Sequence, residues 1–142
     1  MSLDNSKSKI IFFQVTSPPQ KTKKIVYISH YHFSKKENLT ILVSDDKALD
    51  YVDKLLWSTP SISFLPHKAT SSICNDLIVI TKQKENLNNS KYIFNLTNHS
   101  INSFDYHIIY DFEDFTSSQK NETFKKKFKE YHSNKLSIET HS

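Results

Sequence analysis

Short apolar runs recur along the chain, each about as long as a β-strand. They lie at residues 10–15, 39–44, 77–81, 92–97 and 106–112 and are rich in isoleucine, valine, leucine and aromatic side chains. Several are continuously apolar rather than alternating, which is typical of strands covered on both faces. The pattern therefore predicts a sheet buried between layers of helices.

Helical periodicity fills the gaps between these runs. Residues 18–36 open with two prolines, which suit a first helical turn, and continue with apolar residues at near-helical spacing. Residues 45–57 carry one apolar stripe behind two aspartates, and acidic side chains stabilise a helix N-terminus. We expect this second helix to end near Ser58, because Pro60 disfavours helical geometry in the residue before it.

A third helix is predicted at residues 116–132, where Thr116 and Gln119 match a capping box. Aromatic residues fall on one stripe of this helix at i, i+4 and i+7, namely Phe124, Phe128 and Tyr131. The adjacent row is polar and mostly basic, and consists of Asn121, Lys125, Lys129 and His132. The helix therefore offers an aromatic seam bordered by ammonium groups.

The order of strands and helices predicts the α/β class, with a mostly parallel sheet and helices on both faces. Residues 86–90, NLNNS, have turn composition between two strands, which predicts some antiparallel pairing towards one edge. No repeat or linker divides the sequence, so we expect residues 1–142 to form a single domain. The ends, at about residues 1–8 and 135–142, are expected to fray.

Composition narrows the functional classes. The chain has no glycine, so neither a Walker A loop nor a G-x-G-x-x-G nucleotide-binding loop is possible. The single cysteine, Cys74, allows no internal disulfide and no cysteine-based zinc site. No apolar run approaches the roughly 18 residues of a membrane span. We therefore expect a cytoplasmic protein with neither cofactor nor metal and without membrane partners.

Candidate catalytic groups are scattered. His30 and His32 form an H-x-H, but residues two apart on a helix point in different directions and do not easily share a metal. Cys74 has no recognisable base nearby. Acidic residues surround Phe112 and are most simply explained as a solvated turn; they are Asp105, Asp111, Glu113 and Asp114. The sequence thus gives no support for an enzyme.

Net charge is +4 and the sequence pI is about 9.0, which suits an anionic partner. The lysine run at residues 125–129 has three explanations. Lysines near a helix C-terminus favour solubility and complement the macrodipole; they also suit an acidic peptide with a large apolar side chain, or single-stranded nucleic acid. The aromatic seam slightly favours the peptide, because Phe124 and Phe128 are expected to be half buried and poorly placed for base stacking.

Residues 55–67, LLWSTPSISFLPH, contain the only tryptophan and two of the four prolines. In one interpretation, Trp57 closes the preceding helix against the core and the prolines shape a loop. In the other, Trp57, Pro60 and Phe64 form an exposed apolar platform, since such residue types are enriched at binding hot spots. Composition alone favours neither of these two interpretations.

This stretch resembles the chi subunit of the bacterial DNA polymerase III holoenzyme. Leu56-Trp57, Pro60, Ser63-Phe64 and Pro66-His67 follow the string L-W-x-x-P-x-x-S-F-x-P-H. The acidic start of the preceding helix, the strand YIFNL, the D-F ending of YHIIYDF and the basic, aromatic final helix follow in matching order. The resemblance covers roughly residues 10–135; the L-W string is fairly specific, whereas the strands are not.

The resemblance implies a Rossmann-like α/β fold and a non-catalytic adaptor in DNA replication. Chi joins the clamp loader through the psi subunit and grips the acidic C-terminal tail of single-stranded-DNA-binding protein, so contact with DNA is indirect. By this resemblance, the face for psi or a helicase partner comprises Trp57, Pro60 and Phe64. The face for the acidic tail comprises Lys125, Phe128, Lys129 and Tyr131.

The sequence departs from the family pattern on the tail side. Lys125 stands where an arginine could clasp a carboxylate with two hydrogen bonds, and Phe128 replaces a tyrosine. The proline-tyrosine that follows D-F in the family is missing, and residues 113–115 add two acids instead. These changes predict a weaker or differently arranged tail contact. The alternative function is a basic domain that binds single-stranded nucleic acid through its C-terminal lysine-rich helix.

Overall fold

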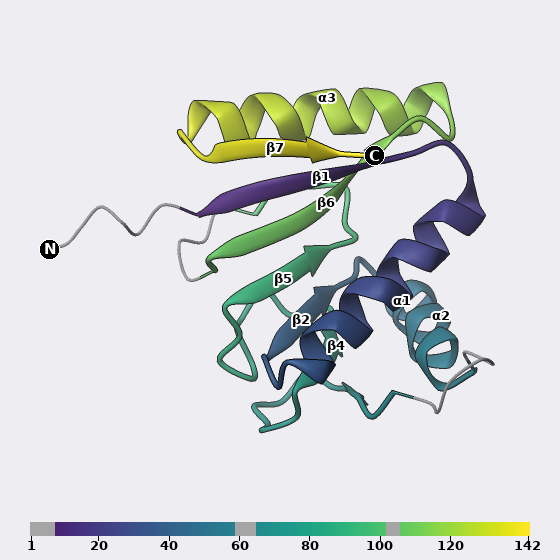
Figure 1. Cartoon of the computed structure of the whole chain (residues 1–142), viewed down its shortest axis with the longest axis vertical. Coiled ribbons are helices and arrows are strands. Elements are labelled where there is room, and N and C mark those ends of the chain that lie inside the picture. Colours follow the sequence, from purple (N-terminus) through teal and green to yellow (C-terminus); the bar gives the residue numbers. More distant parts are fainter. Residues whose placement is uncertain (1–7, 59–64, 102–105) are drawn as a thin grey trace, which may run out of the picture.

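The computed structural model describes residues 8–58, 65–101 and 106–142 (Figure 1). Within them, one sheet has the strand order β3-β4-β2-β5-β6-β1-β7. The strands are β1 (Lys9–Val15), β2 (Leu39–Leu42), β3 (Lys68–Ala69), β4 (Ile78–Thr81), β5 (Tyr92–Asn95), β6 (Ile108–Asp114) and β7 (Ser137–His141). The helices are α1 (Pro18–Ser34), α2 (Asp46–Ser58) and α3 (Ser118–Ser133).

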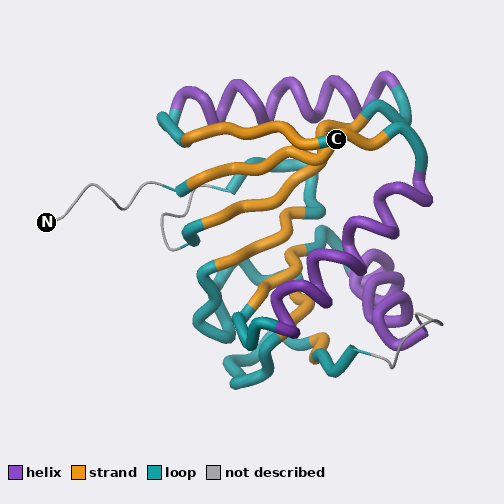
Figure 2. Tube along the Cα trace, in the orientation of Figure 1, coloured by secondary structure: helices purple, strands orange, loops and turns teal. Residues whose placement is uncertain are grey.

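The sheet has helices on both faces, as predicted (Figure 2). Ile25 of α1 and Leu56 of α2 belong to one core cluster, whereas Tyr131 of α3 belongs to the other. Alternate residues of β1 enter the two clusters, because successive side chains of a strand point to opposite faces. Phe13 packs on the side of α1 and α2, and Phe12 packs on the side of α3. The continuous apolar runs therefore do mark strands covered on both faces.

All strand pairs in this sheet are parallel, so the predicted antiparallel pairing at residues 86–90 is wrong. Strands β4 and β5 lie on opposite sides of β2. The segment that joins them therefore crosses β2 instead of closing a hairpin. Asn88 fixes this crossing, because its side-chain amide donates to the carbonyls of Asp76 and Leu77 at 3.0 and 3.2 Å.

The ends of the helices show how a chain without glycine makes its turns. Ser17 caps α1 by accepting a hydrogen bond from the Gln20 amide at 3.4 Å, and the two prolines fill the first turn as predicted. Beyond α1 and α3, left-handed backbone falls on Lys36 (φ 58°) and Lys135 (φ 62°). Glycine is the usual residue at such positions, since a side chain is strained there.

The start of α3 and the C-terminal segment differ from the prediction. Ser117 caps α3 by accepting from the Lys120 amide at 3.1 Å, whereas Thr116 donates to Asp114, so the predicted capping box is wrong. Residues 137–141 do not fray but form β7, which pairs in parallel with β1. A salt bridge of 2.7 Å between Lys9 and Glu139 joins the two strands. Of the N-terminal residues expected to fray, 1–7 lie outside the described residues.

Candidate functional site

Trp57 lies in the last turn of α2 and reaches the protein surface. Its side chain is 44% exposed, whereas the neighbouring Leu56 is completely buried. The indole packs against the imidazole of His67, with ring centroids 4.3 Å apart. Trp57 is thus not enclosed by the core, and its part in an exposed platform stays a prediction. Pro60 and Phe64, which were predicted beside it, lie outside the described residues.

Three of the four residues predicted for the acidic-tail face lie together on the outer side of α3. Phe128 is 37% exposed, and its ring stacks near Phe12 and His132 at centroid distances of 6.1 and 6.4 Å. Lys125 and Lys129 are exposed one helical turn apart. The Lys125 ammonium lies 3.7 Å from Glu122, a long and solvated ion pair that leaves it available to a ligand. Their role in binding remains a prediction.

Tyr131 does not share this surface. It is 0% exposed, and its hydroxyl accepts hydrogen bonds from the Ile101 amide at 3.1 Å and from Asn95 at 3.3 Å. Burial raises the pKa of the Tyr131 phenol. The residue points at the sheet because the buried stripe of α3 runs through positions 124, 127 and 131. Direct contact of Tyr131 with a partner, as predicted, is therefore incompatible with this structure.

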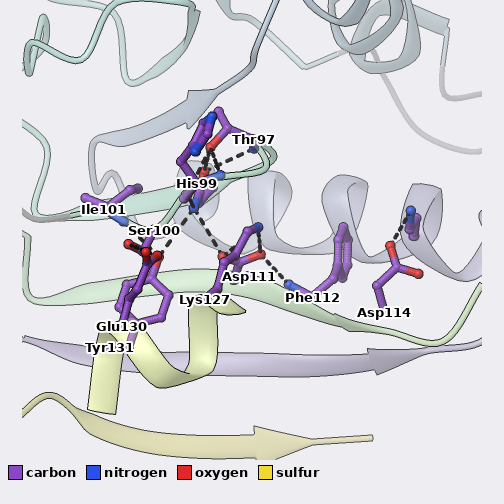
Figure 3. A network of polar contacts seen from close by, with 12 residues as sticks. Thr97, His99, Ser100, Ile101, Asp111, Phe112, Asp114, Lys127, Glu130 and Tyr131 are labelled. Carbon is purple, nitrogen blue, oxygen red and sulfur yellow. Dashed lines mark hydrogen bonds and ion pairs between the residues drawn. The ribbon is translucent and has the colours of Figure 1, made fainter. Parts of the chain in front are cut away.

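A buried ion pair holds α3 against the sheet (Figure 3). The Lys127 ammonium donates to both carboxylate oxygens of Asp111, at 2.9 and 3.1 Å. The Asn95 amide and the Phe112 backbone amide donate to the same carboxylate. Burial raises the pKa of Asp111 to about 6, although Lys127 and these hydrogen bonds partly offset the effect. Asp111 lies within β6, so its assignment to a solvated turn is wrong; Asp105 lies outside the described residues.

A second ion pair links β6 to α1. The Lys21 ammonium lies 2.6 Å from the Asp114 carboxylate, which also accepts from the amide and hydroxyl of Thr116. Burial alone would raise the pKa of Asp114, but the hydrogen bonds from Lys21 and Thr116 outweigh it and leave the pKa below its ordinary value. The Asp114 backbone carbonyl also accepts from the Asn121 side-chain amide of α3 at 3.4 Å, so Asp114 links the end of β6 to α1 and α3.

Both ion pairs line a cavity of about 380 Å³ between α1 and α3, near the end of β6. In α/β folds, the crevice outside the carboxyl ends of the strands is the usual ligand site. Here four of the charged side chains in its walls are already paired within the protein, as Asp111 with Lys127 and Lys21 with Asp114. Pro18 and Pro19 also remove two amide donors from the start of α1, where a phosphate would otherwise bind. The crevice is therefore poorly suited to a nucleotide, as the missing glycines indicate.

One histidine of the H-x-H pair is engaged within the protein. His32 is buried, and its two ring nitrogens lie 2.9 Å from Glu37 and 2.8 Å from the Tyr110 hydroxyl. Burial lowers the pKa of His32, against an opposing effect of Glu37. No cluster of potential metal ligands occurs among the residues that the structure describes. Within the same residues, no helix is long and apolar enough to cross a bilayer.

The comparisons agree with the resemblance noted in the sequence. The family described as DNA polymerase III chi subunit, HolC, matches residues 8–139. The search of curated proteins returned no match. Because the family match spans most of the 142 residues, this chain belongs to the DNA polymerase III chi subunit family. Membership supports an accessory role in DNA replication.

Proposed function

We propose that this chi-family chain is a non-catalytic adaptor that links the clamp loader to the acidic C-terminal tail of single-stranded-DNA-binding protein. The psi subunit, or an equivalent clamp-loader or helicase partner, binds the face around Trp57. The tail binds the outer side of α3. We expect such a replication adaptor to act in the bacterial cytoplasm.

The observation that carries this proposal is the separation of two surfaces of different chemistry. Trp57 belongs to α2, which covers one face of the sheet, whereas Phe128 belongs to α3 on the opposite face (Figure 1). The first surface presents an exposed indole and the second presents an aromatic ring beside ammonium groups. Two surfaces on opposite faces allow two partners to be held at the same time.

The chemistry of α3 suits a peptide that combines acids with a large apolar side chain. Lys125 and Lys129 supply positive charge, and the half-exposed ring of Phe128 supplies an apolar contact. Lysine provides a point charge rather than the two parallel hydrogen bonds of arginine. We therefore expect tail binding that falls as the salt concentration rises, because the contacting charges are exposed.

Calorimetric titration with the phenylalanine-terminated tail peptide of the cognate single-stranded-DNA-binding protein tests the tail face, with oligo-dT as a parallel ligand. Lys125→Glu should weaken peptide binding by about 1–3 kcal/mol. Lys126→Glu carries the same charge change on a neighbouring exposed position and should have a much smaller effect. Equal losses in both variants would contradict a local contact, and binding to oligo-dT alone would favour the nucleic-acid function.

The other face is tested with the psi subunit of the same organism. Trp57→Ala should abolish its binding, because truncating a central aromatic anchor typically costs at least about 2 kcal/mol. The same variant should bind the tail peptide like the wild type. Loss of both activities together would instead indicate misfolding or one shared site, and would contradict the two-surface proposal.

A further inference from the structure

Residues 65–67 contact the C-terminal half of α2. The Leu65 amide donates to the Leu56 carbonyl at 3.3 Å, and the His67 Nε2 atom lies 2.8 Å from an Asp53 carboxylate oxygen. Asp53 and Trp57 are four residues apart on α2 and therefore lie on one side of the helix. His67 thus contacts both residues, Asp53 through its ring edge and Trp57 through ring packing.

The hydrogen-bond partners of His67 fix the orientation of its ring. Its Nδ1 atom lies 2.6 Å from the Leu65 carbonyl oxygen, which can only accept, so Nδ1 carries a hydrogen. Its Nε2 atom lies 2.8 Å from an Asp53 carboxylate oxygen. Both ring nitrogens therefore have a partner, and the ring cannot turn without losing one of these contacts. The Asp53 side chain is 33% exposed, whereas that of His67 is completely buried.

A buried, hydrogen-bonded ring beside an indole holds the indole in place. The ring centroids of His67 and Trp57 are 4.3 Å apart with an interplanar angle of 40°. Aromatic rings in such contact stabilise each other beyond the area that they bury. The imidazole therefore restricts the Trp57 ring while a large part of the indole stays exposed.

We propose that Asp53 and His67 are positioning residues for Trp57: Asp53 keeps the His67 ring oriented, and this ring fixes the indole for its partner. This inference rests on the proposed role of Trp57 in binding the psi subunit or an equivalent protein. Fixing a side chain before association removes the cost of ordering it on binding, which corresponds to about 2- to 10-fold in Kd.

The chain offers a direct spectroscopic test, because Trp57 is its only tryptophan. A histidine ring in contact with an indole quenches its fluorescence. Asp53→Asn keeps the shape of the side chain but removes the carboxylate that holds His67, and His67→Gln keeps a donor but removes the ring. Both variants should raise the emission of Trp57 and lower its fluorescence anisotropy. Asp50→Asn, one turn earlier on α2 and paired with the exposed Lys54, is the matched control and should change neither.

Titration with the psi subunit gives the functional readout. Asp53→Asn should weaken binding by about 2- to 10-fold in an otherwise wild-type chain and have little effect when combined with Trp57→Phe, because it acts through the indole. Equal losses in both backgrounds, or unchanged emission and anisotropy in a folded Asp53→Asn variant, would overturn the positioning role. If psi does not bind the wild type, the proposed partner is wrong. The fluorescence measurements still decide whether Asp53 and His67 fix Trp57.

Discussion

Replacing Lys127 with methionine tests the buried ion pair that joins α3 to β6. Methionine keeps much of the side-chain volume but removes both hydrogen bonds to Asp111, at 2.9 and 3.1 Å. The Asp111 side chain is only 2% exposed, so water replaces the lost ammonium poorly. Removing one partner of a buried pair costs about 3–5 kcal/mol. For a chain of this size, each kcal/mol of lost stability lowers the melting temperature by about 3 °C. The melting temperature should therefore fall by about 10–15 °C at pH 7.5.

The cost of the Lys127→Met substitution should depend on pH. The pKa of Asp111 is raised from 3.8 to about 6 in the fold, so the stability that this group contributes is largest below pH 3.8 and falls as the pH rises towards 6. Without Lys127, an attraction that lowers this pKa is lost, and the carboxyl group takes up a proton more readily. At pH 4.5 a neutral Asp111 no longer needs the ammonium, so the variant should be much closer to the wild type.

Denaturant unfolding at pH 4.5 and pH 7.5 measures both effects. Lys126→Met removes an exposed charge from the adjacent position and should stay within about 0.5 kcal/mol of the wild type. The double substitution Asp111→Asn with Lys127→Met should recover much of the loss, because no buried charge is left unpaired. A Lys127→Met variant as stable as Lys126→Met at pH 7.5, or equally destabilised at both pH values, would refute the reasoning.

Two further predictions concern the backbone and a buried histidine. Lys36→Gly should stabilise the protein by about 0.5–1 kcal/mol in thermal unfolding, because its φ of 58° favours glycine. Lys35→Gly, where φ is −88°, should bring no gain, and equal effects of the two would argue against relief of strain. Burial lowers the pKa of His32, so an NMR titration of its ring should give a midpoint below 6.5, and stability linked to this group should fall as the pH drops through that midpoint. A midpoint above 6.5 would show that Glu37 outweighs burial.

Hydrophobic pattern predicted most of the fold because the sheet interior is the most apolar part of the chain. Strands β1, β2, β4, β5 and β6 each lie within or overlap a predicted run. Strand β7 escaped prediction because its sequence, SIETH, has one aliphatic side chain and is held by pairing with β1 rather than by composition. The turn at residues 86–90 was placed correctly. Turn residues alone, however, do not show whether the next strand pairs with the previous strand in a hairpin or crosses over to pair with another strand.

The sites were harder to predict because identical residue types play different roles on one helix. Lys125, Lys127 and Lys129 cannot be told apart by composition, yet Lys127 is buried and its neighbours are exposed. Helical phase carries the missing signal, since position 127 lies between Phe124 and Tyr131 on the buried stripe. An isolated aspartate in the apolar run 106–112 was the complementary signal, because a buried charge requires a partner. The contact of Trp57 with His67 depends on tertiary structure and had no such signature.

The arrangement of the two surfaces makes one more prediction, that they bind independently. Trp57 is held locally by α2 and His67, and Phe128 is held by α3, which the Asp111–Lys127 pair fixes to the far side of the sheet. Coupling between binding sites requires an element with two arrangements that both ligands bias, and the packed sheet between these helices offers a single parallel register. Saturation with the tail peptide should therefore change the Kd for the psi subunit by less than about twofold, which is close to the limit of additivity for separate sites. A change above about fivefold in paired calorimetric titrations would show that α2 and α3 move together, and the protein would then be a switch rather than a passive link.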